Sequence, residues 1–168
     1  DRRRDLSFVS HAHTHFVGKN RRILATDKTV KILTRKSGKL DALTSPYKRS
    51  FTLGPLRLEL HPAGHVLGSS QLVIDRDDRR LVFASDICTR RSTTVERARP
   101  IACDSLVICP TYGHPMYRFP ERDEVFEKIC KFIDDALNDN ATPVLFANTI
   151  GISQELMRRL GDAGYKLR

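Results

Sequence analysis

Hydrophobic and polar residues alternate along the chain with two different periods. Apolar residues recurring at three- and four-residue steps predict helices over 27–35, 120–140 and 153–160. Short apolar or alternating runs, typical of strands, lie at residues 6–9, 23–26, 57–61, 71–74, 80–84, 105–109 and 143–147. The order of these elements predicts a mixed α/β protein with a largely β middle and a β-α-β-α end.

Several segments carry a further signal. Residues 105–109 are apolar without interruption, which indicates a strand buried on both faces of a sheet. Residues 75–78 are charged and predict the tip of a hairpin between two strands. Residues 36–50 are polar and basic and are predicted to form a loop. Glycine and proline gather in residues 110–120, which we predict to be the junction between two subdomains.

Length and composition exclude several classes of protein. The chain has 168 residues, of which 40% are hydrophobic and 29% charged, which is typical of a globular domain. This length suits one domain, or one domain and a fragment, whereas an eight-fold α/β barrel needs about 250 residues. No apolar run approaches the roughly 18 residues of a membrane helix, and the first residues lack the apolar core of a signal peptide. We therefore expect a soluble, cytoplasmic protein with no membrane partner.

The four cysteines show no C-x-x-C spacing; they are Cys88, Cys103, Cys109 and Cys130. Three of them, all but Cys88, lie in apolar segments. This pattern favours buried, reduced thiols over a disulfide framework or a thiolate metal site.

Histidines cluster directly after the first predicted strand. Three of the six histidines in the chain, His11, His13 and His15, alternate within five residues. In an extended chain, residues i and i+2 point to the same side, so these imidazoles can meet at one metal ion. The alternative is a polar loop in which the histidines coincide by chance.

Two further residues are candidate ligands. His65 lies between Gly64 and Gly68, where the backbone can turn tightly and direct one side chain toward a neighbouring loop. Asp86 ends an apolar strand, where a carboxylate serves as a ligand or caps a loop.

Taken together, these motifs resemble the metallo-β-lactamase fold hydrolases, and among them the nuclease branch that carries a β-CASP insertion. The likeness is to RNA 3′-end-processing factor-like and DNA-ligase-associated exonuclease-like proteins. The stretches that carry it are 8–13 (F-V-S-H-A-H), 61–70 (H-P-A-G-H-V-L-G-S-S), 84–86 (A-S-D), 111–113 (T-Y-G) and 151–156 (G-I-S-Q-E-L).

The resemblance implies an αββα metallo-β-lactamase sandwich over residues 1–109, followed at 110–168 by the start of a β-CASP-like α/β segment. It implies that His11, His13, His65 and Asp86 hold a zinc ion. It also implies phosphodiester hydrolysis by zinc-bound hydroxide, with Asp86 as a catalytic residue. We predict His15 as a second catalytic residue, because its imidazole can accept a proton.

The sequence departs from the family pattern at the second metal site. His15 and Phe16 stand where the family has Asp-His, and Cys109 stands where it has a glutamate. We therefore expect one firmly bound zinc and a weak or absent second one. The strands that open the family domain and its later histidines have no counterpart in the sequence, so we expect a fragment of a longer protein.

Two functions follow from these features. The first is a metal-dependent phosphodiesterase, an exonuclease-like enzyme acting on RNA or single-stranded DNA in RNA processing. The second is a catalytically degenerate relative that binds nucleic acid or serves as a scaffold with at most one metal. Hydrolysis of small thioesters or lactams fits the fold but not the T-Y-G and Q-E-L motifs. Whether the chain is an enzyme, and its oligomeric state, stay open at this point.

Positive charge supports a nucleic-acid partner in both cases. Residues 1–60 contain 14 Lys and Arg against 5 Asp and Glu, a net charge of +9, whereas residues 61–168 contain 15 of each. Most of the excess lies in the basic segment 19–49, between the first histidines and His65. A solvated charged face is one interpretation, but this position favours a track for the phosphate backbone.

Overall fold

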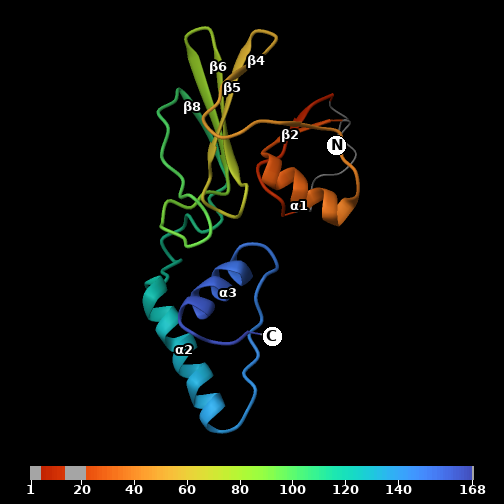
Figure 1. Cartoon of the computed structure of the whole chain (residues 1–168). Coiled ribbons are helices and arrows are strands. Elements are labelled where there is room, and N and C mark those ends of the chain that lie inside the picture. Colours follow the sequence, from red (N-terminus) through yellow and green to blue (C-terminus); the bar gives the residue numbers. More distant parts are fainter. Residues whose placement is uncertain (1–4, 14–21, 168) are drawn as a thin grey trace. The chain divides into compact units, whose positions relative to one another are not determined.

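The computed structural model describes residues 5–13 and 22–167 of the chain (Figure 1). It divides the chain into two compact units, Asp1–Pro110 and Thr111–Arg168. The first unit contains two sheets and a helix, and the second contains two helices. The predicted mixed α/β class is confirmed.

The smaller sheet of the first unit is parallel. Its order is β1 (Ser7–Phe8), β2 (Ile23–Ala25) and β3 (Ala42–Thr44), with β2 in the middle. Helix α1 (Asp27–Ser37) connects β2 to β3. It begins at Thr26, whose hydroxyl accepts a hydrogen bond from the backbone N–H of Thr29, as expected of an N-cap threonine.

The larger sheet is mostly antiparallel and holds five strands in sequence order. They are β4 (Phe51–Leu53), β5 (Leu56–Pro62), β6 (Ser70–Arg76), β7 (Arg79–Ser85) and β8 (Ser105–Ile108). Charged residues form the turn between β6 and β7, as predicted. Strand β8 runs parallel to β7 and lies at the edge of the sheet.

One hydrophobic core joins the two sheets. Leu24 of β2 packs with Leu58 and Leu60 of β5 and with Leu72 of β6, all of them buried. Across the same interface, the ring of Phe8 meets that of Phe83 edge to face, with 5.8 Å between centroids. This packing fixes the carboxyl end of β1 against the larger sheet.

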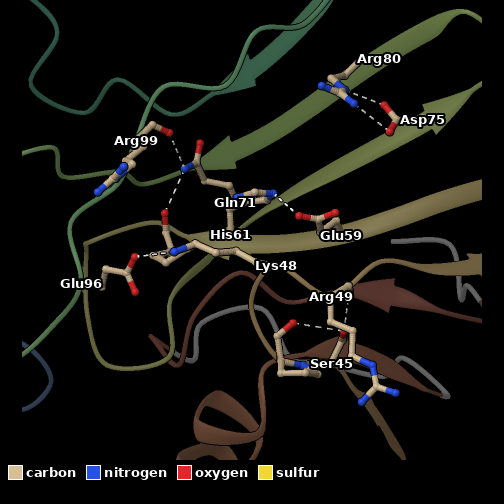
Figure 2. A network of polar contacts seen from close by, with 12 residues as sticks. Ser45, Lys48, Arg49, Glu59, His61, Gln71, Asp75, Arg80, Glu96 and Arg99 are labelled. Carbon is tan, nitrogen blue, oxygen red and sulfur yellow. Dashed lines mark hydrogen bonds and ion pairs between the residues drawn. The ribbon is translucent and has the colours of Figure 1, made fainter.

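The opposite face of the larger sheet is covered by the segment that leads to β8. Val73, Val82 and Ala84 are buried there against Ile101 and Cys103. The side-chain amide of Gln71, which is buried, donates hydrogen bonds to the carbonyl oxygens of Pro62 (3.0 Å) and Arg99 (3.2 Å) (Figure 2). Gln71 therefore ties β5, β6 and the covering segment together with a single side chain.

The second unit is a pair of helices, α2 (Arg122–Asn138) and α3 (Ile152–Asp162). Arg159 of α3 lies over the ring of Phe126, 4.0 Å from its centroid, and its guanidinium donates to Asp123. Arg122 pairs with Glu155 at 3.2 Å. Charged and aromatic contacts therefore hold the two helices together.

Three predictions about secondary structure and burial are wrong. Strand β8 is not buried on both faces: all four of its residues are exposed, Leu106 to 56%, because little of the described chain packs over the sheet at this edge strand. Residues 143–147 form no strand, and Phe146 is 96% exposed; no described strand supplies the hydrogen bonds that a strand there needs. The predicted loop 36–50 contains β3, which pairs with β2.

The prediction of buried cysteines is wrong, because none of the four is buried. Cys109 is exposed, and the other three are partly buried. Cys109 follows the edge strand β8, which explains its exposure. In the described part of the chain, no helix combines the length and apolar character that crossing a membrane requires.

Candidate metal centre

Three histidines from two distant segments converge in the first unit. His11, His13 and His65 each offer a ring nitrogen, and these atoms all lie within 4.8 Å of one another. The ring centroids form a nearly equilateral triangle with sides of 5.0, 4.9 and 5.0 Å. Each ring meets the others edge to face, at interplanar angles between 76° and 86°.

The donor set fits a zinc ion. Zinc binds imidazole nitrogens at about 2.0–2.1 Å, so two ligands of a tetrahedral site lie about 3.3–3.4 Å apart. Nε2 of His65 and Nδ1 of His13 are 3.1 Å apart. Neutral imidazole is also a preferred ligand of zinc. The three histidines therefore form a cluster whose size and chemistry suit the ion.

The carboxyl end of β1 positions the first two histidines. The backbone N–H of Val9 donates to the carbonyl of Leu24 (2.9 Å), which continues the pairing of β1 with β2. The carbonyl of Ser10 then accepts the N–H of Ser70 (2.8 Å), the first residue of β6. The chain that carries His11 and His13 thus starts from a point held by both sheets.

A closed turn between β5 and β6 positions His65. The backbone N–H of Ala63 donates to the carbonyl of Ser69 (3.0 Å), and the N–H of Ser69 donates to the carbonyl of Val66 (2.9 Å). The hydroxyl of Ser69, which is buried, accepts the N–H groups of His65 and Val66, both at 3.1 Å. These bonds fix the backbone at His65 itself.

Helix α1 holds this turn from one side. The hydroxyls of Thr26 and Thr29 both donate to the carbonyl of Gly68, at 2.7 and 2.9 Å. Tyr47 donates its hydroxyl to the next carbonyl, that of Ser69 (2.8 Å). Gly68 has φ +83°, and a Cβ there would lie only 2.7–2.9 Å from atoms of Lys28 and Thr29. The turn therefore sits against the first turn of α1 without space for a side chain.

The segment after β7 holds the turn from the other side. The N–H of Cys88 donates to the carbonyl of Ala63 (2.8 Å), and the N–H of Ala98 donates to the carbonyl of Cys88 (2.9 Å). A Cβ on Gly64, which has φ +70°, would collide with these same backbone atoms of Cys88 and Ala98. Both glycines beside His65 are thus required by close backbone approach and by positive φ.

Burial keeps two of the three rings, His11 and His65, neutral. It lowers the pKa of His11 to about 4, an effect to which the neighbouring His65 and His13 add and which Asp86 opposes. Burial likewise lowers the pKa of His65. In the absence of a metal, both rings are therefore neutral near pH 7, the form that binds metal ions.

Asp86 lies beside the cluster. Its Oδ2 is 3.8 Å from Nε2 of His11, and the carboxylate is 31% exposed. Among the described residues, the group with mutually close donor atoms consists of the three histidines, so a ligand role for Asp86 stays a prediction. His15, the other residue predicted to be catalytic, lies outside the described residues, and its role also stays a prediction.

Sequence reasoning missed the residues that hold the histidines in place. Thr26, Thr29 and Tyr47 bind the turn that carries His65, but nothing in their local sequence relates them to it. Ser69 lies in the same turn, and its hydroxyl fixes the backbone of His65. The one usable signal was the pair of glycines around His65, since they indicate a tight turn with close neighbours.

The chain is similar to proteins of nucleic-acid processing. It is 30% identical, over 160 residues (94% of its length), to a protein named "Probable DNA ligase" from Opitutus terrae. It is 27% identical over 61% of its length to "Transcription termination factor FttA" from Lokiarchaeum sp.. It is 25% identical over 61% of its length to an "RNase J-like protein" from Methanocaldococcus jannaschii.

These similarities cover small parts of the relatives. The chain spans 16%, 17% and 25% of their respective lengths. No family model matches the chain.

The contact between Gly68 and α1 predicts an asymmetry between two glycines with nearly the same positive φ. Gly68 (φ +83°) and Gly38 (φ +81°) both disfavour an alanine through φ, but a Cβ at Gly38 meets nothing within 4 Å. Gly38 has ψ −167°, a region adopted essentially by glycine, so we expect Gly38→Ala to lower the free energy of unfolding by about 1–3 kcal/mol. We expect Gly68→Ala to cost about 1–3 kcal/mol more, as for overpacking. Urea denaturation measures both, and equal losses would contradict the packing described above.

The lowered pKa of His11 predicts a pH-dependent stability of the metal-free protein. An unfolded histidine titrates near pH 6.5, whereas the folded protein resists protonating His11 until about pH 4. The unfolded state therefore binds more protons between these values, and the free energy of unfolding falls as the pH drops through this range. When the pH is lowered from 7.5 to 5, the free energy of unfolding should fall in both proteins. We expect this fall to be about 1–2 kcal/mol smaller in His11→Asn than in the unchanged protein, as measured by urea denaturation. The same loss in both proteins would contradict this account.

Proposed function

We propose that this chain belongs to a metal-dependent nuclease of the metallo-β-lactamase fold, β-CASP branch, that hydrolyses phosphodiester bonds in RNA or single-stranded DNA. The observation that carries the proposal is the triangle of His11, His13 and His65, which the fold assembles from segments 52 residues apart. The names of the similar proteins, which include an RNase J-like protein, support nucleic acid as the substrate.

The architecture is compatible with this proposal. The first unit has two sheets packed face to face with α1 beside the smaller one, as part of an αββα sandwich would have. We assign residues 1–109 to the metallo-β-lactamase-like domain and residues 110–168 to the start of a β-CASP-like segment. Since the chain spans 16–25% of the relatives named above, the activity of a whole protein is part of the proposal.

The proposed ligands of zinc are His11, His13, His65 and Asp86. Bound zinc would lower the pKa of a coordinated water toward neutrality and so supply a nucleophile. Neutral imidazoles and one carboxylate offset only one of the two positive charges of the ion. The site therefore favours an anionic substrate such as a phosphodiester.

The residues of this chain supply orientation and proton transfer. Asp86 stands beside the cluster, and it is exposed enough to meet a substrate or a water. We propose His15 as a second proton acceptor, because it follows His13 by two residues in the sequence. With Phe16 unable to bind a metal, we propose one firm zinc site rather than two.

A second candidate function is nucleic-acid binding without hydrolysis. The observation that favours it is the replacement of the family's glutamate by Cys109, together with His15-Phe16 in place of Asp-His. In this case the histidine triangle would hold one structural metal. The experiment below separates the two functions.

The basic segment 19–49 is the proposed contact for the phosphate backbone. Lys28 lies in the first turn of α1, beside the turn that carries His65, since its Cβ is among the atoms nearest to a Cβ placed on Gly68. Three of the positive charges are offset by ion pairs, namely Arg22–Asp41, Lys31–Asp27 and Lys48–Glu96. Of the other cations in the described part of this segment, the exposed Lys28, Arg35 and Lys39 are chosen for the test.

Zinc binding and cleavage test the function directly. After dialysis, we expect about one zinc per chain, measured by atomic emission, and none in His65→Ala. We expect the unchanged protein to cleave labelled single-stranded RNA or DNA with zinc or manganese, and His65→Ala to lose this activity. His114→Ala, which removes an exposed histidine of the second unit, is the matched control and should keep both properties.

The outcomes separate the two candidates. Zinc binding with retained affinity for nucleic acid but without cleavage would favour the non-catalytic function. A protein that binds no zinc, or whose cleavage survives in His65→Ala, would contradict the proposed nuclease site.

Salt dependence tests the basic segment. Each phosphate contact to a single strand contributes about 0.7 to the slope of log K against log salt concentration. We expect the triple variant Lys28→Gln, Arg35→Gln, Lys39→Gln to lower this slope by up to about 2. The control triple Arg57→Gln, Arg76→Gln, Arg79→Gln has the same charge change outside the segment and should leave the slope unchanged. Equal effects of the two triples would contradict a backbone contact at α1.

A further inference from the structure

A chain of hydrogen bonds leads from the end of β7 to the candidate metal centre. The hydroxyl of Ser10 lies 2.8 Å from Nδ1 of His11 and donates to the hydroxyl oxygen of Ser85 at 3.2 Å. These three residues come from two segments 75 positions apart, and all are at least partly buried. The contact between Ser10 and Ser85 therefore connects the first histidine segment with the end of β7, directly before Asp86.

The direction of these bonds decides which nitrogen of His11 carries a proton. The geometry of the Ser10–Ser85 contact suits Ser10 as the donor, and a serine hydroxyl has one proton to donate. The 2.8 Å contact between Ser10 and Nδ1 of His11 fits either tautomer by itself. With the Ser10 proton on Ser85, Ser10 accepts from His11, and we infer that Nδ1 is the protonated nitrogen. The other nitrogen, Nε2, keeps its lone pair for a ligand. The nearby oxygen Oδ2 of Asp86 is 3.8 Å from Nε2, beyond hydrogen-bond distance.

The backbone at Ser85 is held in an uncommon conformation. Ser85 has φ +51°, a region that residues other than glycine rarely adopt, and the pairing of β7 with β8 shifts its register there. Its carbonyl accepts the N–H of Cys109 (3.0 Å). This conformation turns the chain directly before Asp86 and at the same residue whose hydroxyl accepts from Ser10. Uncommon backbone conformations of this kind cluster at functional sites.

We propose that Ser85 and Ser10 are positioning residues that fix His11 as the Nδ1–H tautomer and leave its Nε2 for a metal ion. Ser85 acts through Ser10, and neither hydroxyl needs to touch the metal or the substrate. The role in metal binding rests on the proposed function, whereas the tautomer itself is a property of the metal-free protein. Hydrogen-bond partners of metal-binding histidines typically set the ring orientation and tautomer in this way.

The tautomer is measurable near neutral pH because the His11 ring is neutral there; burial lowers its pKa to about 4. Ring nitrogen spectra of the metal-free, ¹⁵N-histidine-labelled chain at pH 7.5 distinguish protonated from unprotonated nitrogens. His11→Asn assigns the His11 signals. We expect Nδ1 of His11 to be protonated and Nε2 to be unprotonated in the unchanged protein.

Two substitutions separate the hydroxyls from the backbone. Ser85→Gly suits the positive φ and removes the acceptor, so the hydroxyl of Ser10 becomes free to donate to Nδ1, and the ring proton is expected to move to Nε2. Ser10→Ala removes the constraint and is expected to give a mixture of tautomers. Ser10→Thr keeps a hydroxyl and is expected to retain the Nδ1–H form. Zinc affinity, measured by calorimetry, should fall about 10- to 100-fold in Ser85→Gly.

The results bear separately on the hydrogen-bond relay from Ser85 through Ser10 to His11 and on the proposed function. An Nε2–H tautomer in the unchanged protein, or the same tautomer in the unchanged protein and in Ser85→Gly, would overturn the relay. If the tautomers behave as expected but the unchanged protein binds no zinc, the relay stands and the proposed nuclease function fails. If zinc binds but the tautomer does not respond to Ser85→Gly, the relay fails and the proposed zinc site stands.

Discussion

The geometry of the histidine cluster depends on the carbonyl group of Gly68. Two threonine hydroxyls at the start of α1 donate to this one oxygen, and the glycine lies too close to α1 to carry a side chain. Through this contact, the position of α1 beside the smaller sheet sets the position of His65 in the turn between β5 and β6. If the turn moved away from the helix, it would lose both bonds. A buried carbonyl left without a partner is costly, so this contact holds the turn in place.

The chemistry of the site follows from this rigidity. His11 and His13 come from a segment held by both sheets, and His65 comes from a turn held by α1 and by the segment after β7. The protein's own hydrogen bonds therefore hold the three rings together, and burial keeps His11 and His65 neutral. Two neutral rings release few protons on metal binding, and a cluster held by the fold needs little ordering.

The sequence predicted the elements with strong periodicity and the histidines that meet. The helix starting at Asp27 and the strands on either side of the charged turn 75–78 follow from patterns within a few residues. The exposure of Leu106 and the missing strand at 143–147 were not predictable in this way, because they depend on which neighbouring strands are present. The same limit hides Thr29 and Tyr47, whose hydroxyls bind a turn that lies more than 20 residues away along the chain.

The central claim is that three histidines, and not the others in the described chain, form one preformed metal site. A zinc titration of the ¹⁵N-histidine-labelled protein, followed through the ring nitrogen signals, tests it most directly. The account predicts that the signals of His11, His13 and His65 change together and that these changes are complete at one equivalent of zinc. The signals of His61 and His114 should stay in place. Separate changes of the three, or a response of His61 or His114 at the same equivalent, would contradict it.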